Sequence, residues 1–183
     1  MDNKTDLRTR AKAIRKTLDM PALSAELTEK LRTHEFYKSA KNVMIYYPKE
    51  DEINVLGLLS DDKNFYLPRV NGDLLHACPY CTDDKLECSS FNVMEPCTAA
   101  VDTKILDLIV VPALMADKNN FRLGYGGGFY DRFLAANPGI FSTVLIPQEL
   151  FIDSLPVESF DIPVNKIIVI PHLLWDLPPE MPE

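Results

Sequence analysis

The feature that most constrains this chain is residues 122–131, which read RLGYGGGFYD. The chain has only seven glycines, and four of them, Gly124, Gly126, Gly127 and Gly128, fall within these ten residues. Glycine takes positive φ without steric cost and lets another group approach the backbone closely, so the cluster predicts a tight turn against a ligand. A flexible glycine hairpin would contain the same residues, and spacing alone leaves that alternative open.

The residues on either side of the cluster favour an anionic ligand. Residues 105–112 form an apolar run broken only by Asp107, which predicts a buried strand, and residues 130–136 predict a helix. The first N–H groups of a helix lack internal partners and lie at its positive end, so phosphate oxygens bind there, and Arg122 can add a charged hydrogen bond. The stretch lacks both the Gly-Lys-Ser/Thr ending of a P-loop and the dinucleotide-binding spacing, and we expect no strand to lead directly into Gly124.

The bulk properties indicate one acidic domain covering residues 1–183. With 183 residues, of which 46% are hydrophobic, the chain can bury a full core. A formal net charge of -8 argues against a general nucleic-acid or anionic-membrane surface, so we expect anion binding to be local. Residues 1–10 are charged, and no apolar run approaches the roughly 20 residues that span a bilayer, so we expect a cytoplasmic protein.

Cysteine usage agrees with a reducing compartment. Cys78 and Cys81 have the spacing of a redox or zinc pair, but they lie in a turn-rich stretch and not at a helix start. Cys88 and Cys97 are too far apart to complete a zinc site as a second close pair, so free thiols are favoured over a metal. The last residues, 173–183, hold three prolines and three acids, and we expect them to fray.

The first helix is predicted over residues 5–18, where apolar residues recur at helical spacing. Lys4, Arg8 and Arg15 fall on a separate stripe of this helix, which is either a phosphate-binding surface or an ordinary solvated flank. A second helix, with Pro21 in its first turn, should end near residues 36–37.

Strands then alternate with helices. Residues 42–47 predict a strand, residues 53–59 a short helix and residues 65–68 a second strand, and the connecting loop carries Glu52. Open α/β sheets bind ligands at the carboxyl ends of their strands, so Glu52 is placed for chemistry, although an acid at a helix N-terminus is also favoured by the dipole alone. A hairpin with loops is expected in residues 71–100, and further strands at residues 142–146 and 166–170 complete a layered α/β domain.

The stretch RLGYGGGFYDR at residues 122–132 resembles the signature of the 5-formyltetrahydrofolate cyclo-ligase family, also called 5,10-methenyltetrahydrofolate synthetase. The likeness extends along nearly the whole chain and is supported by residues 4–8, residues 47–52, residues 67–69, Glu95-Pro96 and the region of Asp161. It implies a three-layer α/β domain with a central, mostly parallel sheet, similar to the ribose-phosphate isomerase and coenzyme A transferase fold.

The resemblance also implies a reaction and a set of site residues. It implies a monomeric enzyme that uses ATP and Mg²⁺ to convert 5-formyltetrahydrofolate to 5,10-methenyltetrahydrofolate, releasing ADP and phosphate. The formyl oxygen would be phosphorylated before the ring closes, with Glu52, Arg122 and Tyr125 as the catalytic residues. By position, ATP would be held by Lys4, Arg8, Arg122, Leu123, Gly124, Tyr125, Gly126, Gly127, Gly128, Phe129 and Tyr130. The folate would be held by Tyr47, Glu52, Tyr125 and Phe129, and the metal by Asp131 and Asp161.

Three positions depart from the family pattern. Phe160 stands where histidine is frequent, Asn165 where an acid is common, and Asn54 where threonine is usual. Two other functions therefore stay open: a non-catalytic folate- or nucleotide-binding relative, and a sugar-phosphate isomerase-like enzyme on the same fold that would need no ATP.

Overall fold

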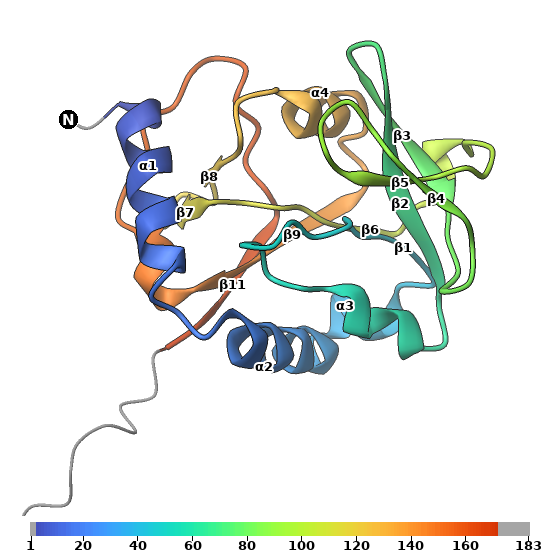
Figure 1. The fold of residues 1–183 in the computed structure, drawn as a ribbon, viewed down its shortest axis with the longest axis horizontal. Coiled ribbons are helices and arrows are strands. Elements are labelled where there is room, and N and C mark those ends of the chain that lie inside the picture. Colours follow the sequence, from blue (N-terminus) through green and yellow to red (C-terminus); the bar gives the residue numbers. More distant parts are fainter. Residues whose placement is uncertain (1–2, 172–183) are drawn as a thin grey trace, which may run out of the picture.

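A six-stranded sheet forms the middle of the protein (Figure 1). The computed structural model describes residues 3–171, so the tail expected to fray at residues 173–183 lies outside the described residues. Every neighbouring pair of strands in the sheet is parallel except β2 and β3, which form an antiparallel hairpin. In sheet order the strands are β11 (Lys166–Ile170), β9 (Phe141–Pro147), β6 (Leu108–Val110), β1 (Asn42–Met44), β2 (Asn64–Asn71) and β3 (Leu74–Pro79).

Each face of the sheet has its own hydrophobic core, because side chains alternate along a strand. In β9, Val144 and Ile146 pack into the core on one face and Leu145 into the core on the other. The first core is covered by α1 (Lys4–Arg15) and α4 (Phe129–Ala136), and the second by α2 (Met20–Thr33), α3 (Glu35–Ser39) and the 3₁₀ helix η1 (Leu56–Ser60) (Figure 1). The result is the expected mixed α/β domain with a central, mostly parallel sheet.

Two smaller sheets are separate from the central one, and the first of them contributes residues to the first core. β7 (Met115–Asp117) pairs with β8 (Arg122–Leu123) and β10 (Phe151–Ile152), and β4 (Leu86–Cys88) pairs with β5 (Met94–Pro96). Single 3₁₀ turns, η2 (Thr103–Ile105) and η3 (Gln148–Leu150), complete the described elements. The segment between residues 71 and 100 therefore contains the end of one hairpin and a second complete one.

Several local predictions differ from the structure. The helix expected over residues 5–18 ends at Arg15, and the short helix expected at residues 53–59 is the 3₁₀ helix η1 at Leu56–Ser60. The strand expected at residues 42–47 ends at Met44, because the chain then leaves the sheet, and the strand expected at residues 105–112 covers only Leu108–Val110. The second helix ends at Thr33, because His34 has an extended backbone (φ -80°, ψ 135°), and α3 follows as a separate helix. The strand β8 leads directly into Gly124, which contradicts the expectation that none would.

Among residues 3–171, no helix is both long enough and apolar enough to cross a bilayer.

Candidate active site

A cavity of about 620 Å³ opens where β1 and β6 end. Its lining comes from α1, the loop after β1, the β2–β3 hairpin, the loop between β4 and β5, the glycine loop before α4, and residues 158–161. All fifteen residues that the sequence assigned to ATP, folate, metal or catalysis line this one cavity. The Glu52 loop, which follows β1 of the central sheet, and the glycine loop, which follows β8 of a small sheet, therefore line the same cavity.

The glycine loop forms one wall with an open backbone. Gly126 has φ +104° and Gly128 has φ +68°, so two of these residues adopt the left-handed conformation that side chains disfavour. At Gly127 a Cβ atom would lie 2.8 Å from the ring of Phe129, so this position also excludes a side chain. Gly128 is the N-cap of the eight-residue α4 and no side chain caps it, which leaves the first N–H groups of α4 to a ligand.

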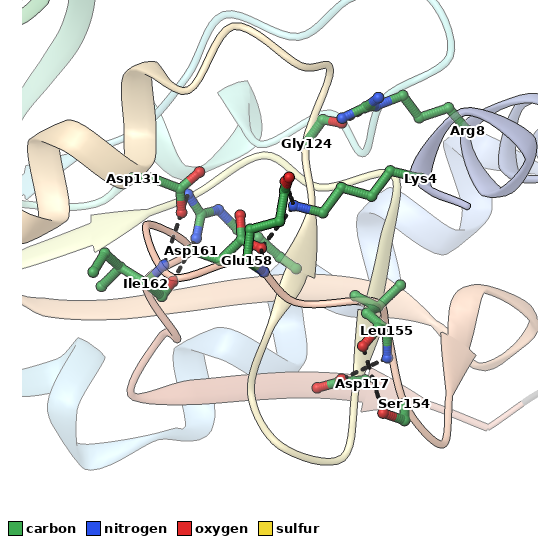
Figure 2. Close-up of polar contacts among 11 residues, drawn as sticks. Lys4, Arg8, Asp117, Gly124, Asp131, Ser154, Leu155, Glu158, Asp161 and Ile162 are labelled. Atoms are coloured by element: carbon green, nitrogen blue, oxygen red, sulfur yellow. Dashed lines mark hydrogen bonds and ion pairs between the residues drawn. The ribbon is translucent and has the colours of Figure 1, made fainter. Parts of the chain in front are cut away.

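Two basic residues of α1, Arg8 and Lys4, lie at the cavity, one against the glycine loop and the other against residues 158–161 (Figure 2). The Arg8 Nε donates to the Gly124 carbonyl at 2.9 Å, and Lys4 Nζ lies 2.6 Å from carboxylate oxygens of both Glu158 and Asp161. Partial burial alone would lower the pKa of Lys4, but the hydrogen bonds and charges of Asp161 and Glu158 raise it above its ordinary value. The helix therefore presents two cations to an anionic ligand.

Arg122 lies beneath the loop and is almost wholly buried, with 4% of its side chain exposed. It donates to Asp131 Oδ1 at 3.0 Å and to the Ile162 carbonyl at 2.8 Å. Asp131 Oδ1 also accepts from the Ile162 N–H at 3.0 Å (Figure 2). Burial lowers the pKa of Arg122, and the Asp131 charge opposes that shift. Arg122 thus ties the loop of residues 158–162 to the start of α4 while it lines the cavity.

Asp131 and Asp161 line the same cavity but do not form a metal cage. Asp161 Oδ2 accepts from Lys4 Nζ and from the Glu158 N–H at 2.7 Å, and Asp131 is engaged by Arg122. Within residues 3–171, no group of three or more His, Cys, Asp or Glu side chains is arranged to hold a metal ion. Because Mg²⁺ is commonly held by one or two carboxylates together with substrate phosphates, these residues fit an ion that arrives with a nucleotide.

Glu52, in the loop after β1, also lines the cavity and is only 7% exposed. Its carboxylate accepts from the Lys49 N–H at 2.7 Å and from the Tyr125 hydroxyl, and Lys49 Nζ lies 4.8 Å from the centre of the Tyr125 ring. Burial raises the pKa of Glu52 above its ordinary value, while those two hydrogen bonds partly oppose the rise. Tyr47 lines the cavity beside it.

An apolar wall, which the sequence reasoning did not assign, faces the glycine loop. It consists of Pro68 and Val70 of β2, Leu75 of β3, and Phe91 and Val93 between β4 and β5. Phe91 is 50% exposed and its ring meets that of Phe129 edge-on at 5.3 Å. In the sequence, Phe91 could have been noticed as a large apolar residue among the polar residues of a hairpin loop.

Several residues singled out in the sequence lie elsewhere. Arg15 does not share the surface of Lys4 and Arg8, because its side chain turns into the core and is 2% exposed. Asn165 accepts hydrogen bonds from the N–H and hydroxyl of Ser142, away from the cavity, whereas Phe160 lies at the cavity, 5.5 Å from Lys4 Nζ. The cysteines at positions 78, 81, 88 and 97 are free thiols.

Comparisons with known proteins agree with one another. The profile of the 5-formyltetrahydrofolate cyclo-ligase family matches residues 1–170. The curated 5-formyltetrahydrofolate cyclo-ligase of Haemophilus influenzae is 31% identical over 144 residues, which cover 72% of this chain and 77% of that protein. The mouse protein of the same name is 27% identical, over 80% of this chain and 86% of that protein. The NMR structure of the Aquifex aeolicus 5,10-methenyltetrahydrofolate synthetase superposes with a TM-score of 0.77, at 27% identity, and covers 91% of this chain and 89% of that one.

Proposed function

The chain belongs to the 5-formyltetrahydrofolate cyclo-ligase family, and from this premise we propose that it converts 5-formyltetrahydrofolate to 5,10-methenyltetrahydrofolate with ATP and Mg²⁺, releasing ADP and phosphate. One observation carries the proposal: a single cavity is lined by the glycine loop with two basic residues, by apolar side chains and by a buried carboxylate. A nucleotide and a flat, largely apolar cosubstrate would meet across such a cavity.

The glycine wall is assigned to the ATP phosphates. The left-handed backbone at Gly126 and Gly128 keeps side chains out of the space that phosphate oxygens would occupy, and the N–H groups that open α4 point to the same place. Arg8 and Lys4 would neutralise phosphate charge, and Arg122 would add a positive charge from beneath the loop. Leu123 and Tyr130 complete this wall from the core side.

Magnesium would be held by Asp131 and Asp161 together with the phosphates. When bound, the ion supplies charge neutralisation at the transferring phosphoryl group. Asp161 is engaged by Lys4 before any ligand binds, so we expect Lys4 to shift from the carboxylate toward phosphate when the metal and nucleotide arrive.

The apolar wall is assigned to the folate. Tyr47, Phe129 and Phe91 provide aromatic surface for a pterin and an aminobenzoyl ring, and Glu52 is the buried acid that faces them. A buried carboxylate that accepts only two protein hydrogen bonds retains capacity to bind an amine N–H of the substrate.

In this reaction the residues of the chain mainly position the reactants and neutralise charge. The formyl oxygen attacks the γ-phosphorus and the bond to the β-phosphate oxygen breaks, which releases ADP and leaves an activated carbon on N5. The N10 amine then attacks that carbon, the carbon–oxygen bond breaks, phosphate leaves, and the N10 proton is lost. Glu52 orients the amine and accepts its proton, and Tyr125 holds the Glu52 carboxylate in place from the nucleotide side. Because all assigned residues come from one chain, we further propose that the monomer is active.

The test is the absorbance of methenyltetrahydrofolate formed by purified protein with 5-formyltetrahydrofolate, Mg²⁺ and ATP. We expect product only when all three are present, with one ADP released per product. Binding of both ligands without product would instead indicate a non-catalytic relative. Turnover of a sugar phosphate without ATP would indicate the isomerase-like alternative.

A further inference from the structure

Arg15 is a buried cation outside the cavity lining. It is the last residue of α1, it is 2% exposed, and its guanidinium donates to the backbone carbonyls of Asp51, at 2.5 Å, and of Ala113. Its Nε is buried without a hydrogen-bond partner among the described residues. A planar guanidinium can hold two carbonyls in a fixed fork, which a lysine cannot do.

The two carbonyls belong to residues that adjoin the cavity lining in two different segments. Asp51 directly precedes Glu52 in the loop after β1, and Ala113 directly follows Pro112, a cavity-lining residue in the segment after β6. One side chain therefore links the ends of two adjacent strands of the sheet, on the side where α1 covers it. The same helix carries Arg8 and Lys4 at its other end.

Arg15 also acts on Glu52 through its charge. The groups that shift the pKa of this carboxyl are Lys49, Tyr125 and Arg15. The Glu52 charge in turn raises the pKa values of Tyr46, Tyr125 and Tyr130, which lie around it. Burial raises the pKa of Glu52, and Lys49, Tyr125 and Arg15 oppose this rise. Of these three, Arg15 is a positively charged side chain that lies buried in the core. Lys49 opposes the rise as well, but from the partly exposed cavity edge.

We propose that Arg15 is a positioning residue for the reaction: it fixes the backbone beside Glu52 against the segment after the neighbouring strand, and so holds the carboxyl that receives the substrate amine. This inference rests on the proposed function, in which Glu52 is the folate-side carboxylate. Arg15 itself touches neither substrate.

The experiment compares Arg15→Met and Arg15→Lys with the wild type. Arg32→Met is the matched control, because Arg32 is also structural, pairing with Asp61 and donating to the Gly57 carbonyl at 2.9 Å, but lies outside the cavity lining. The Glu52 pKa is measured by carbon NMR of the side-chain carboxyl, assigned with Glu52→Gln, and kcat and KM are measured across pH for each substrate.

We expect Arg15→Met to raise the Glu52 pKa and to lower kcat/KM for the folate roughly ten- to a hundredfold, with a smaller effect on the KM for ATP. The pH at which kcat/KM reaches half its maximum should rise with the Glu52 pKa. Arg15→Lys should keep the Glu52 pKa near its wild-type value but should not restore kcat/KM for the folate, since one ammonium cannot hold both carbonyls. If Arg15→Met does not fold, the comparison of Arg15→Lys with the wild type tests the inference. Arg32→Met should lower the melting temperature and leave the Glu52 pKa unchanged.

A folded Arg15→Met protein with an unmoved Glu52 pKa, or with wild-type kcat/KM, overturns the inference. Absence of turnover in the wild type would overturn the proposed function instead. The NMR titration needs no turnover, so the two failures are distinguishable.

Discussion

The Tyr125 hydroxyl, in the glycine loop, donates a hydrogen bond to the Glu52 carboxylate, in the loop after β1. These residues lie in the two walls of the cavity that we assign to ATP and to folate. Burial raises the pKa of Tyr125, and the neighbouring Glu52 charge raises it further, so the phenol stays protonated and remains a donor at physiological pH. The contact therefore connects the two halves of the site.

Glu52→Gln should lower kcat/KM for 5-formyltetrahydrofolate and leave ATP binding nearly unchanged. The amide keeps the shape but cannot accept a proton, and loss of a charged hydrogen bond costs about 1.5–3 kcal/mol, which corresponds to roughly ten- to a hundredfold. Titrating ATP and the folate separately on Glu52→Gln shows which substrate is affected. Tyr125→Phe is the companion variant, because it removes only the hydroxyl that donates to Glu52. A defect confined to ATP would place Glu52 on the nucleotide side.

Glu52→Gln should also be more stable than the wild type at neutral pH. Burial raises the folded pKa of Glu52 from its ordinary value of 4.5, so the folded state binds this proton more tightly than the unfolded state. The stability linked to this group is complete below about pH 4.5 and is lost as pH rises through the folded pKa. Melting temperatures of both proteins from pH 4 to pH 8 should therefore diverge with rising pH, and parallel curves would contradict the prediction.

Alanine at Gly126 or Gly128 should raise the KM for ATP. Both residues have positive φ, where a Cβ costs about 1–2 kcal/mol, and relaxation of that strain would move the N–H groups that we assign to phosphate. Gly139→Ala is the control, because a Cβ there meets nothing within 4 Å and φ is not positive. Unchanged ATP binding in both loop variants would remove the phosphate assignment.

Arg8→Met should weaken ATP binding more than folate binding. Arg8 lines the cavity and orients the Gly124 carbonyl, whereas the Lys12→Met control removes an exposed charge from the same helix outside the cavity. Point substitution is sharper than truncation of residues 1–10, because truncation also removes the buried Leu7. Isothermal titration with ATP analogues should give a loss for Arg8→Met and wild-type affinity for Lys12→Met.

Asp131→Asn and Asp161→Asn should each raise the Mg²⁺ concentration needed for half-maximal activity. An amide oxygen is a weaker ligand for a hard cation than a carboxylate oxygen. Asp131→Asn should also lower the melting temperature, because the buried Arg122 would lose the charge of its partner. A Mg²⁺ dependence that is unchanged in both variants would exclude these residues as the metal ligands.

The sequence by itself determined those features that depend on local chemistry. Strands β9 and β11 agree with the predicted segments within two residues, because long apolar runs of β-branched residues specify a buried strand locally. The glycine cluster predicted positive φ and a helix start, since only glycine tolerates that backbone without cost. The strand-loop-helix-strand pattern placed Glu52 at the carboxyl end of a strand, where open α/β sheets bind ligands, but it left open that this residue only begins a helix.

Only the tertiary structure decided which side chains face the cavity. Lys4, Arg8 and Arg15 share one stripe by helical periodicity, yet only the first two line the site, because the loops of residues 51 and 113 cover the end of α1. Periodicity gives the direction of a side chain from its own helix, whereas burial depends on segments far away in the chain. For the same reason the raised pKa of Glu52 and the contact of Phe91 with Phe129 could not be predicted, since each depends on partners that the fold alone brings near.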